Sequence, residues 1–88
     1  MLKKELHLII TFRDTVMAIR MEKAMKEAGL PGRIIPLPSA ISAGCGLCFM
    51  APLEAREALQ QEMEKQEITW ELITELMLCF RASREIAY

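Results

Sequence analysis

The chain alternates short apolar runs with two longer segments whose apolar residues recur at helical spacing. Runs of four to eight residues rich in apolar and β-branched side chains are typical of strands. Apolar residues three and four positions apart fall on one face of a helix. The predicted strands are residues 5–12, 33–38, 47–51 and 68–74, and the predicted helices are residues 15–28 and 52–65. The resulting order is strand, helix, strand, strand, helix, strand.

This order predicts an α+β fold, the ferredoxin-like βαββαβ sandwich, in which two helices cover one face of an antiparallel sheet. A chain of 88 residues has room for one core. We expect one domain over residues 1–75 and a C-terminal extension over residues 76–88. The apolar stretch LMLCF at residues 76–80 could continue the last strand, but we favour a short docked or dimer-facing helix.

Local capping signals bound the two predicted helices. Asp14 or Thr15 can accept a hydrogen bond from a first-turn N–H group, and Gly29 is suited to the position just after a helix. Pro52 fits the first turn of the second helix. These boundaries also set where the intervening loops begin.

Composition narrows the class of function. The net charge is −1 and the basic residues are scattered, which argues against a nucleic-acid partner. No run approaches the roughly 20 apolar residues that span a bilayer. The basic and apolar N-terminus is followed by Arg13 and Asp14 rather than by a cleavage site. We therefore expect a cytoplasmic protein without a membrane partner. Its three cysteines are an odd number and do not make a complete disulfide framework.

The segment PLPSAISAGCGLC, residues 36–48, holds two of the three cysteines. In the predicted fold the first two strands run parallel, so this loop should lie at the start of the first helix, beside Arg13. The helix dipole and the Arg13 charge would favour the thiolate form of Cys45, whereas Asp14 would oppose it. Gly44 and Gly46 would allow a tight turn and close approach to the Cys45 sulfur.

A reactive thiolate at Cys45 is one possible function of this segment. Three alternatives are also consistent with these residues. Cys45 and Cys48 could form a redox dithiol, although their spacing straddles a loop and a strand. The same two cysteines with Cys79 and His7 could bind zinc, although only one pair has ligand spacing. A third alternative is a non-catalytic ferredoxin-like module for binding or dimerisation.

Residues 5–75 resemble a family of short bacterial and archaeal proteins, the selenium/sulfur carrier protein-like family. The matching features are a strand that ends in Thr-Phe, a helix with an Ala-x-x-x-Glu-Lys run, and an Ile-Pro-x-Pro segment followed by Ser and Cys-Gly. In this chain they are Thr11, Phe12, Ala18, Glu22, Lys23, Ile35, Pro36, Pro38, Ser42, Cys45 and Gly46. Cys48 has no counterpart in the pattern.

The resemblance implies that Cys45 carries sulfur or selenium as a persulfide or selenosulfide. Ser42 and Arg13 would then donate hydrogen bonds to the carried atom. The implied partners are a cysteine desulfurase-like donor, an acceptor protein and, as a further option, a second copy of the chain. On this basis we expect a carrier or accessory protein rather than a stand-alone enzyme. No cofactor or metal is expected beyond the covalently carried atom.

Overall fold

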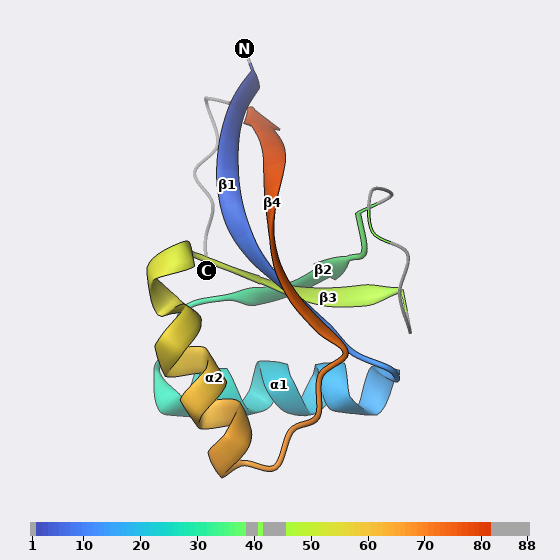
Figure 1. The fold of residues 1–88 in the computed structure, drawn as a ribbon, viewed down its shortest axis with the longest axis vertical. Coiled ribbons are helices and arrows are strands. Elements are labelled where there is room, and N and C mark those ends of the chain that lie inside the picture. The colour runs from blue at the N-terminus through green and yellow to red at the C-terminus, as the bar shows by residue number, and fades with distance from the viewer. Residues whose placement is uncertain (1, 39–40, 42–45, 82–88) are drawn as a thin grey trace.

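A computed structural model of the chain describes residues 2–38, 41 and 46–81, with the backbone alone for residues 2–4 and 78–81. Its elements, shown in Figure 1, are β1 (Leu2–Thr11), α1 (Thr15–Ala28), β2 (Arg33–Pro36), β3 (Leu47–Ala51), a 3-10 turn η1 (Leu53–Ala55), α2 (Arg56–Lys65) and β4 (Leu72–Arg81). Among these residues no helix combines the length and apolar character needed to cross a membrane.

The four strands form one sheet in the order β2-β3-β1-β4. Each neighbouring pair is antiparallel, so β1 and β2, which both pair with β3, run parallel to each other. The α+β prediction is confirmed, and the strand order is compatible with the ferredoxin-like arrangement. Both helices lie on the same side of the sheet, below it in Figure 1.

Alternation along β1 divides the buried side chains between two faces. Leu8, Ile10 and Phe12 point to the face covered by the helices, here called the helix face. Ile9 points to the opposite face, as expected from the two-residue period of a strand. The helix face carries a cluster of twelve buried residues, namely Leu8, Ile10, Phe12, Ala18, Met21, Met25, Phe49, Ala51, Ala55, Leu59, Met63 and Ile68.

The boundaries predicted for α1 are confirmed. The Asp14 side chain accepts a hydrogen bond from the Met17 N–H at 2.9 Å, which caps the first turn. Gly29 ends the helix in the left-handed conformation, with φ 73°. Gly32 then brings the backbone against the Phe49 ring, where a Cβ atom would overlap the ring. These local interactions aim the chain from α1 into β2.

The strand predicted at residues 68–74 begins later than expected. After α2 the chain turns through Glu67, which has φ 57°, and the Ile68 N–H donates to the Met63 carbonyl at 2.9 Å. Ile68 is buried in the helix-face cluster and Trp70 packs against that cluster, although neither belongs to a strand. Their alternating burial comes from this helix-ending turn, and β4 starts at Leu72.

The helix favoured for LMLCF is wrong, because residues 76–80 lie inside β4. Residues Leu2–His7 of β1 pair there with β4 alone, since β3 reaches only Leu8–Thr11. In Figure 1 these parts of β1 and β4 extend together away from the helices as a two-stranded ribbon. β4 therefore crosses the boundary expected between residues 75 and 76, and residues 82–88 lie outside the described residues.

Candidate functional site

One backbone hydrogen bond closes the loop between β2 and β3, and a second forms a turn within its first part. The Leu37 N–H donates to the Gly46 carbonyl at 2.9 Å, and the Ile41 N–H donates to the Pro38 carbonyl at 3.0 Å. Ser42, Gly44 and Cys45, which the sequence singles out, lie outside the described residues.

Gly46, the residue after Cys45, has the backbone geometry that the sequence analysis required of a tight turn. Its φ is 81°, a conformation that L side chains rarely adopt. Among the described residues, no atom outside its chain neighbours lies within 4 Å of the position that a Cβ would occupy, and Gly46 is exposed. Steric crowding therefore does not demand glycine here, but the left-handed turn does.

Arg13 and Gly46 lie at the same end of the sheet. Thr11 and Cys48 are register partners, Arg13 follows Thr11 by two residues, and Gly46 precedes Cys48 by two on the antiparallel strand. The loop therefore closes beside the start of α1, as the topology predicted. Arg13 is exposed at this end, and Asp14 uses its carboxylate to cap the helix.

Cys48 is fully buried on the opposite face of the sheet, in a small cluster with Ile9 and Met50. Leu37 and Ile41, which flank the first part of the loop, pack against the same cluster. Reactive cysteines are characteristically accessible to their partners, whereas buried ones behave as small apolar side chains. This burial disfavours the dithiol alternative, in which the Cys48 sulfur must exchange with external thiols.

Thr11 lies directly across from Cys48, and the sequence analysis used it only as part of the family pattern, with no role at the site. Its side chain is 1% exposed, and its Oγ1 atom has no hydrogen-bond partner among the described residues. His7, Ile9 and Thr11 are spaced two residues apart and therefore share one face of the strand. A threonine on the same face as a buried isoleucine is the sequence signal that could have identified it. The structure thus adds a buried hydroxyl to the end of the sheet where the cysteine loop closes.

The described part of the chain contains no cluster of side chains that would support the zinc alternative. His7 is 4% exposed, and its Nε2 lies 3.3 Å from a Glu5 carboxylate oxygen. His7 lies four positions before Thr11, the register partner of Cys48, and four positions span roughly 13 Å along a strand. Residues 2–38, 41 and 46–81 hold no group of three or more His, Cys, Asp or Glu side chains placed to bind a metal.

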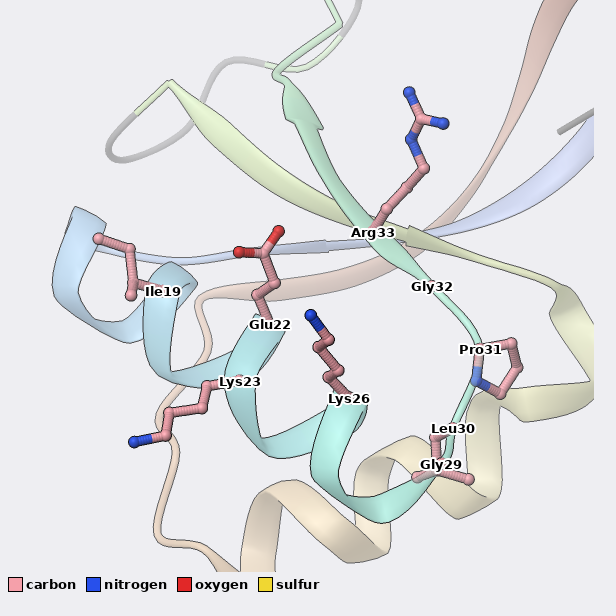
Figure 2. A pocket seen from close by; sticks show the side chains of 9 residues that line it. All are labelled: Ile19, Glu22, Lys23, Lys26, Gly29, Leu30, Pro31, Gly32 and Arg33. Carbon is pink, nitrogen blue, oxygen red and sulfur yellow. The ribbon is translucent and has the colours of Figure 1, made fainter. Parts of the chain in front are cut away.

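A surface groove of about 880 Å³ lies between α1 and the start of β2. In Figure 2 the Glu22 and Lys26 side chains extend from α1 towards β2, whereas Arg33 extends away from the helix. The lining residues are Ile19, Glu22, Lys23, Lys26, Gly29, Leu30, Pro31, Gly32 and Arg33. Arg33 begins β2 and the cysteine loop follows its end, so the groove lies mainly away from that loop.

The described features define a small α+β protein in which the loop between β2 and β3 closes at the end of the sheet where α1 begins. Residues 7–75 match the sequence model of the family described as "Putative Se/S carrier protein-like". The chain belongs to this family, and the resemblance inferred from residues 5–75 is confirmed. The family description indicates a carrier of selenium or sulfur, a role that involves contact with other proteins.

One curated relative is the uncharacterized protein YtiA of Escherichia coli strain K12. The two sequences are 33% identical over 52 residues, a segment that covers 59% of this chain and 61% of the relative. The matched segment thus spans about three fifths of that protein. No solved structure is significantly similar to this chain.

Proposed function

We propose that the protein carries sulfur or selenium on Cys45 and transfers it between two other proteins. The observation that supports this proposal is the family match, which includes Cys45 and Gly46 within residues 7–75. The family description supplies the cargo, and the sequence supplies one cysteine that matches the motif.

The proposed reaction is two successive thiol–disulfide-type exchanges. The Cys45 thiolate attacks the outer sulfur of a persulfide on the donor, the sulfur–sulfur bond of the donor breaks, and the donor cysteine leaves as a thiolate. A nucleophile on the acceptor then attacks the outer sulfur of the Cys45 persulfide, and Cys45 leaves as a thiolate. Each step breaks one bond to the transferred sulfur and forms another, so no external oxidant or reductant is consumed. Selenium would follow the same two steps.

The surroundings of the loop are consistent with this chemistry. Gly46 is exposed, which is consistent with close approach by a donor protein. Arg13 is an exposed cation at the same end of the sheet, and a positive charge favours both the attacking and the leaving thiolate. Ser42 keeps its proposed role as a hydrogen-bond donor to the carried atom, and Gly44 its proposed role of allowing a tight turn and close approach to the Cys45 sulfur.

Partner proteins would need a surface beside this loop. Val16 and Ile19, in the first half of α1, are 62% and 58% exposed. Large apolar side chains exposed next to one another are common at sites of protein contact. We assign this part of α1 to docking of the donor, which is proposed to resemble a cysteine desulfurase.

The test is mass spectrometry of the purified protein after incubation with a cysteine desulfurase and cysteine. The wild-type chain is expected to gain about 32 Da, the mass of one sulfur, on the peptide that contains Cys45. Cys45→Ser should abolish the adduct because serine cannot form a persulfide.

Cys48→Ala is the matched control, because it removes a cysteine three positions away whose side chain is buried. This variant should still gain the adduct on Cys45. A wild-type protein that gains no mass, or an adduct that persists in Cys45→Ser, would contradict the proposal.

A further inference from the structure

The groove between α1 and β2 is shaped by local features of the chain. α1 ends at Gly29 in the left-handed conformation, and the Leu30 N–H donates to the Met25 carbonyl at 2.9 Å. Leu30 also packs against the helix-face cluster. Gly32 then passes so close to the Phe49 ring that a Cβ atom would overlap the ring. The fold therefore fixes the walls of the groove, and a partner would meet a site that is already formed.

Positive charge is concentrated along this groove. Its lining includes three basic residues, Lys23, Lys26 and Arg33, and one acidic residue, Glu22. The whole chain has 11 basic and 12 acidic residues, so the groove is positive in a chain whose net charge is −1. A concave surface lined mainly by one sign of charge attracts groups of the opposite sign. The charge of the groove therefore favours an anionic partner.

The two lysines of the groove are accessible to such a partner. Both are exposed, and neither takes part in an ion pair or a side-chain hydrogen bond within the part of the chain that the structure describes. In Figure 2 the Lys26 ammonium group lies between α1 and β2, whereas Lys23 extends from the outer side of the helix. Arg33 takes part in an interaction of its own, so Lys26 and Lys23 are the principal binding groups.

Ile19 adds an apolar contact at one end of the groove. Its side chain is 58% exposed, and it belongs to the part of α1 assigned above to donor docking. Ile19, Lys23 and Lys26 are spaced by four and three residues and therefore share one face of the helix. This face is about 10 Å long, which matches three residues of an extended chain. A segment that fits it has an apolar side chain followed by acidic ones.

We propose that this groove binds an acidic segment of a partner protein. Carboxylates of the segment pair with Lys26 and Lys23, and its apolar side chain packs on Ile19. Glu22 favours a polypeptide over a nucleic acid, because its carboxylate repels a uniformly anionic backbone but accepts a hydrogen bond from a peptide N–H group. This binding goes beyond the proposed carrier role and does not require Cys45.

Fluorescence anisotropy of a labelled synthetic peptide, mixed with the full chain, tests the proposal. The peptide has one leucine followed by alternating glutamate and glycine, and its control has glutamine in place of every glutamate. The wild-type protein should bind the glutamate peptide about fivefold more tightly than the control peptide. An increase in salt from about 50 mM to about 500 mM should remove most of this preference, because the contacts are made by exposed charges.

Lys26→Glu and Lys65→Glu form a matched pair of variants. Each lysine is exposed and is the basic residue in the last turn of its helix, α1 or α2, but Lys65 does not line the groove. The two changes alter the net charge and the helix end in the same way. Lys26→Glu should weaken binding of the glutamate peptide about tenfold, and Lys65→Glu less than about twofold. Far-UV circular dichroism verifies that both variants are folded.

Three results would overturn the proposed binding. Equal affinities for the two peptides would show that charge has no part in it, and equal effects of Lys26→Glu and Lys65→Glu would show that the groove has none. A single-stranded DNA oligonucleotide that binds as tightly as the glutamate peptide, and is weakened equally by Lys26→Glu, would identify a general polyanion site instead. Cys45→Ser should keep the wild-type affinity, so the outcome is separate from that of the sulfur-loading test.

Discussion

Among the residues that the structure describes, twelve buried apolar residues form one cluster on the helix face of the sheet, whereas the cluster on the opposite face has three. Two helices supply much of the first cluster. The second is bounded by partly buried residues, among them Leu37 and Ile41 beside the cysteine loop. Both clusters depend on the same strands, since neighbouring residues of β1 alternate between them.

The two faces also differ in polar content. On the opposite face, the buried polar side chains His7 and Thr11 lie on either side of Ile9 along β1. The Thr11 hydroxyl has no partner among the described residues. An unsatisfied buried hydroxyl lowers stability. The difference indicates that the helix face provides most of the stability, while the opposite face retains features that packing alone does not explain.

Ile9 and Ile10 give the most direct comparison of the two faces, because they are the same residue type, adjacent in β1 and both 0% exposed. Ile10→Ala should lower the free energy of unfolding by about 4 kcal/mol and Ile9→Ala by about 2 kcal/mol. The smaller cluster around Ile9 can collapse more readily around a cavity. Urea unfolding monitored by circular dichroism measures both values, and equal losses would show that the two faces are packed equally well.

Gly46 and Gly29 allow the end of the β2–β3 loop to be compared with the C-terminal end of α1. Both have positive φ, 81° and 73°, and neither would bring a Cβ within 4 Å of another group. Alanine at either position should therefore lower the free energy of unfolding by a similar amount, about 1–2 kcal/mol.

Sulfur loading separates these two variants, because Gly46 adjoins Cys45 and Gly29 does not. We expect Gly46→Ala to slow the formation of the Cys45 persulfide and Gly29→Ala to leave its rate unchanged, as followed by mass spectrometry. Equal rates in both variants would mean that the backbone turn at Gly46 has no part in loading.

Thr11→Val gives the smallest expected effect and has the opposite sign. Valine has nearly the same shape as threonine and removes the unpartnered Oγ1 atom, so the free energy of unfolding should rise by about 1 kcal/mol. Thermal unfolding measures this change. A lower stability would show that the hydroxyl is hydrogen-bonded, and Thr11→Ser, which keeps the hydroxyl, is the control for side-chain shape.

The order of elements and the limits of α1 could be predicted because they depend on local signals. Asp14 caps the helix through a residue three positions away, and Gly29 ends it through its own backbone conformation. The relation between the loop and Arg13 followed from strand direction alone. Each of these inferences needs only neighbouring residues or the topology of the sheet.

The rest depended on contacts between distant parts of the chain. Residues 76–80 are strand because β1 extends far enough to pair with them, which their apolar composition does not reveal. Ile68 and Trp70 are spaced two residues apart, like residues on one face of a strand, but Ile68 is buried by the turn after α2. The face of the sheet on which the Cys48 side chain lies follows from its pairing with Thr11. The sequence alone could not decide whether this side chain faces the helices.

The proline in β2 has a consequence for the size of any assembly formed through the sheet. A sheet that can pair at both edges can add copies without limit and produce fibres. Here Pro36 and the short length of β2 make the β2 edge a poor template for a further strand. Open-ended growth of the sheet, which needs both edges, is therefore disfavoured.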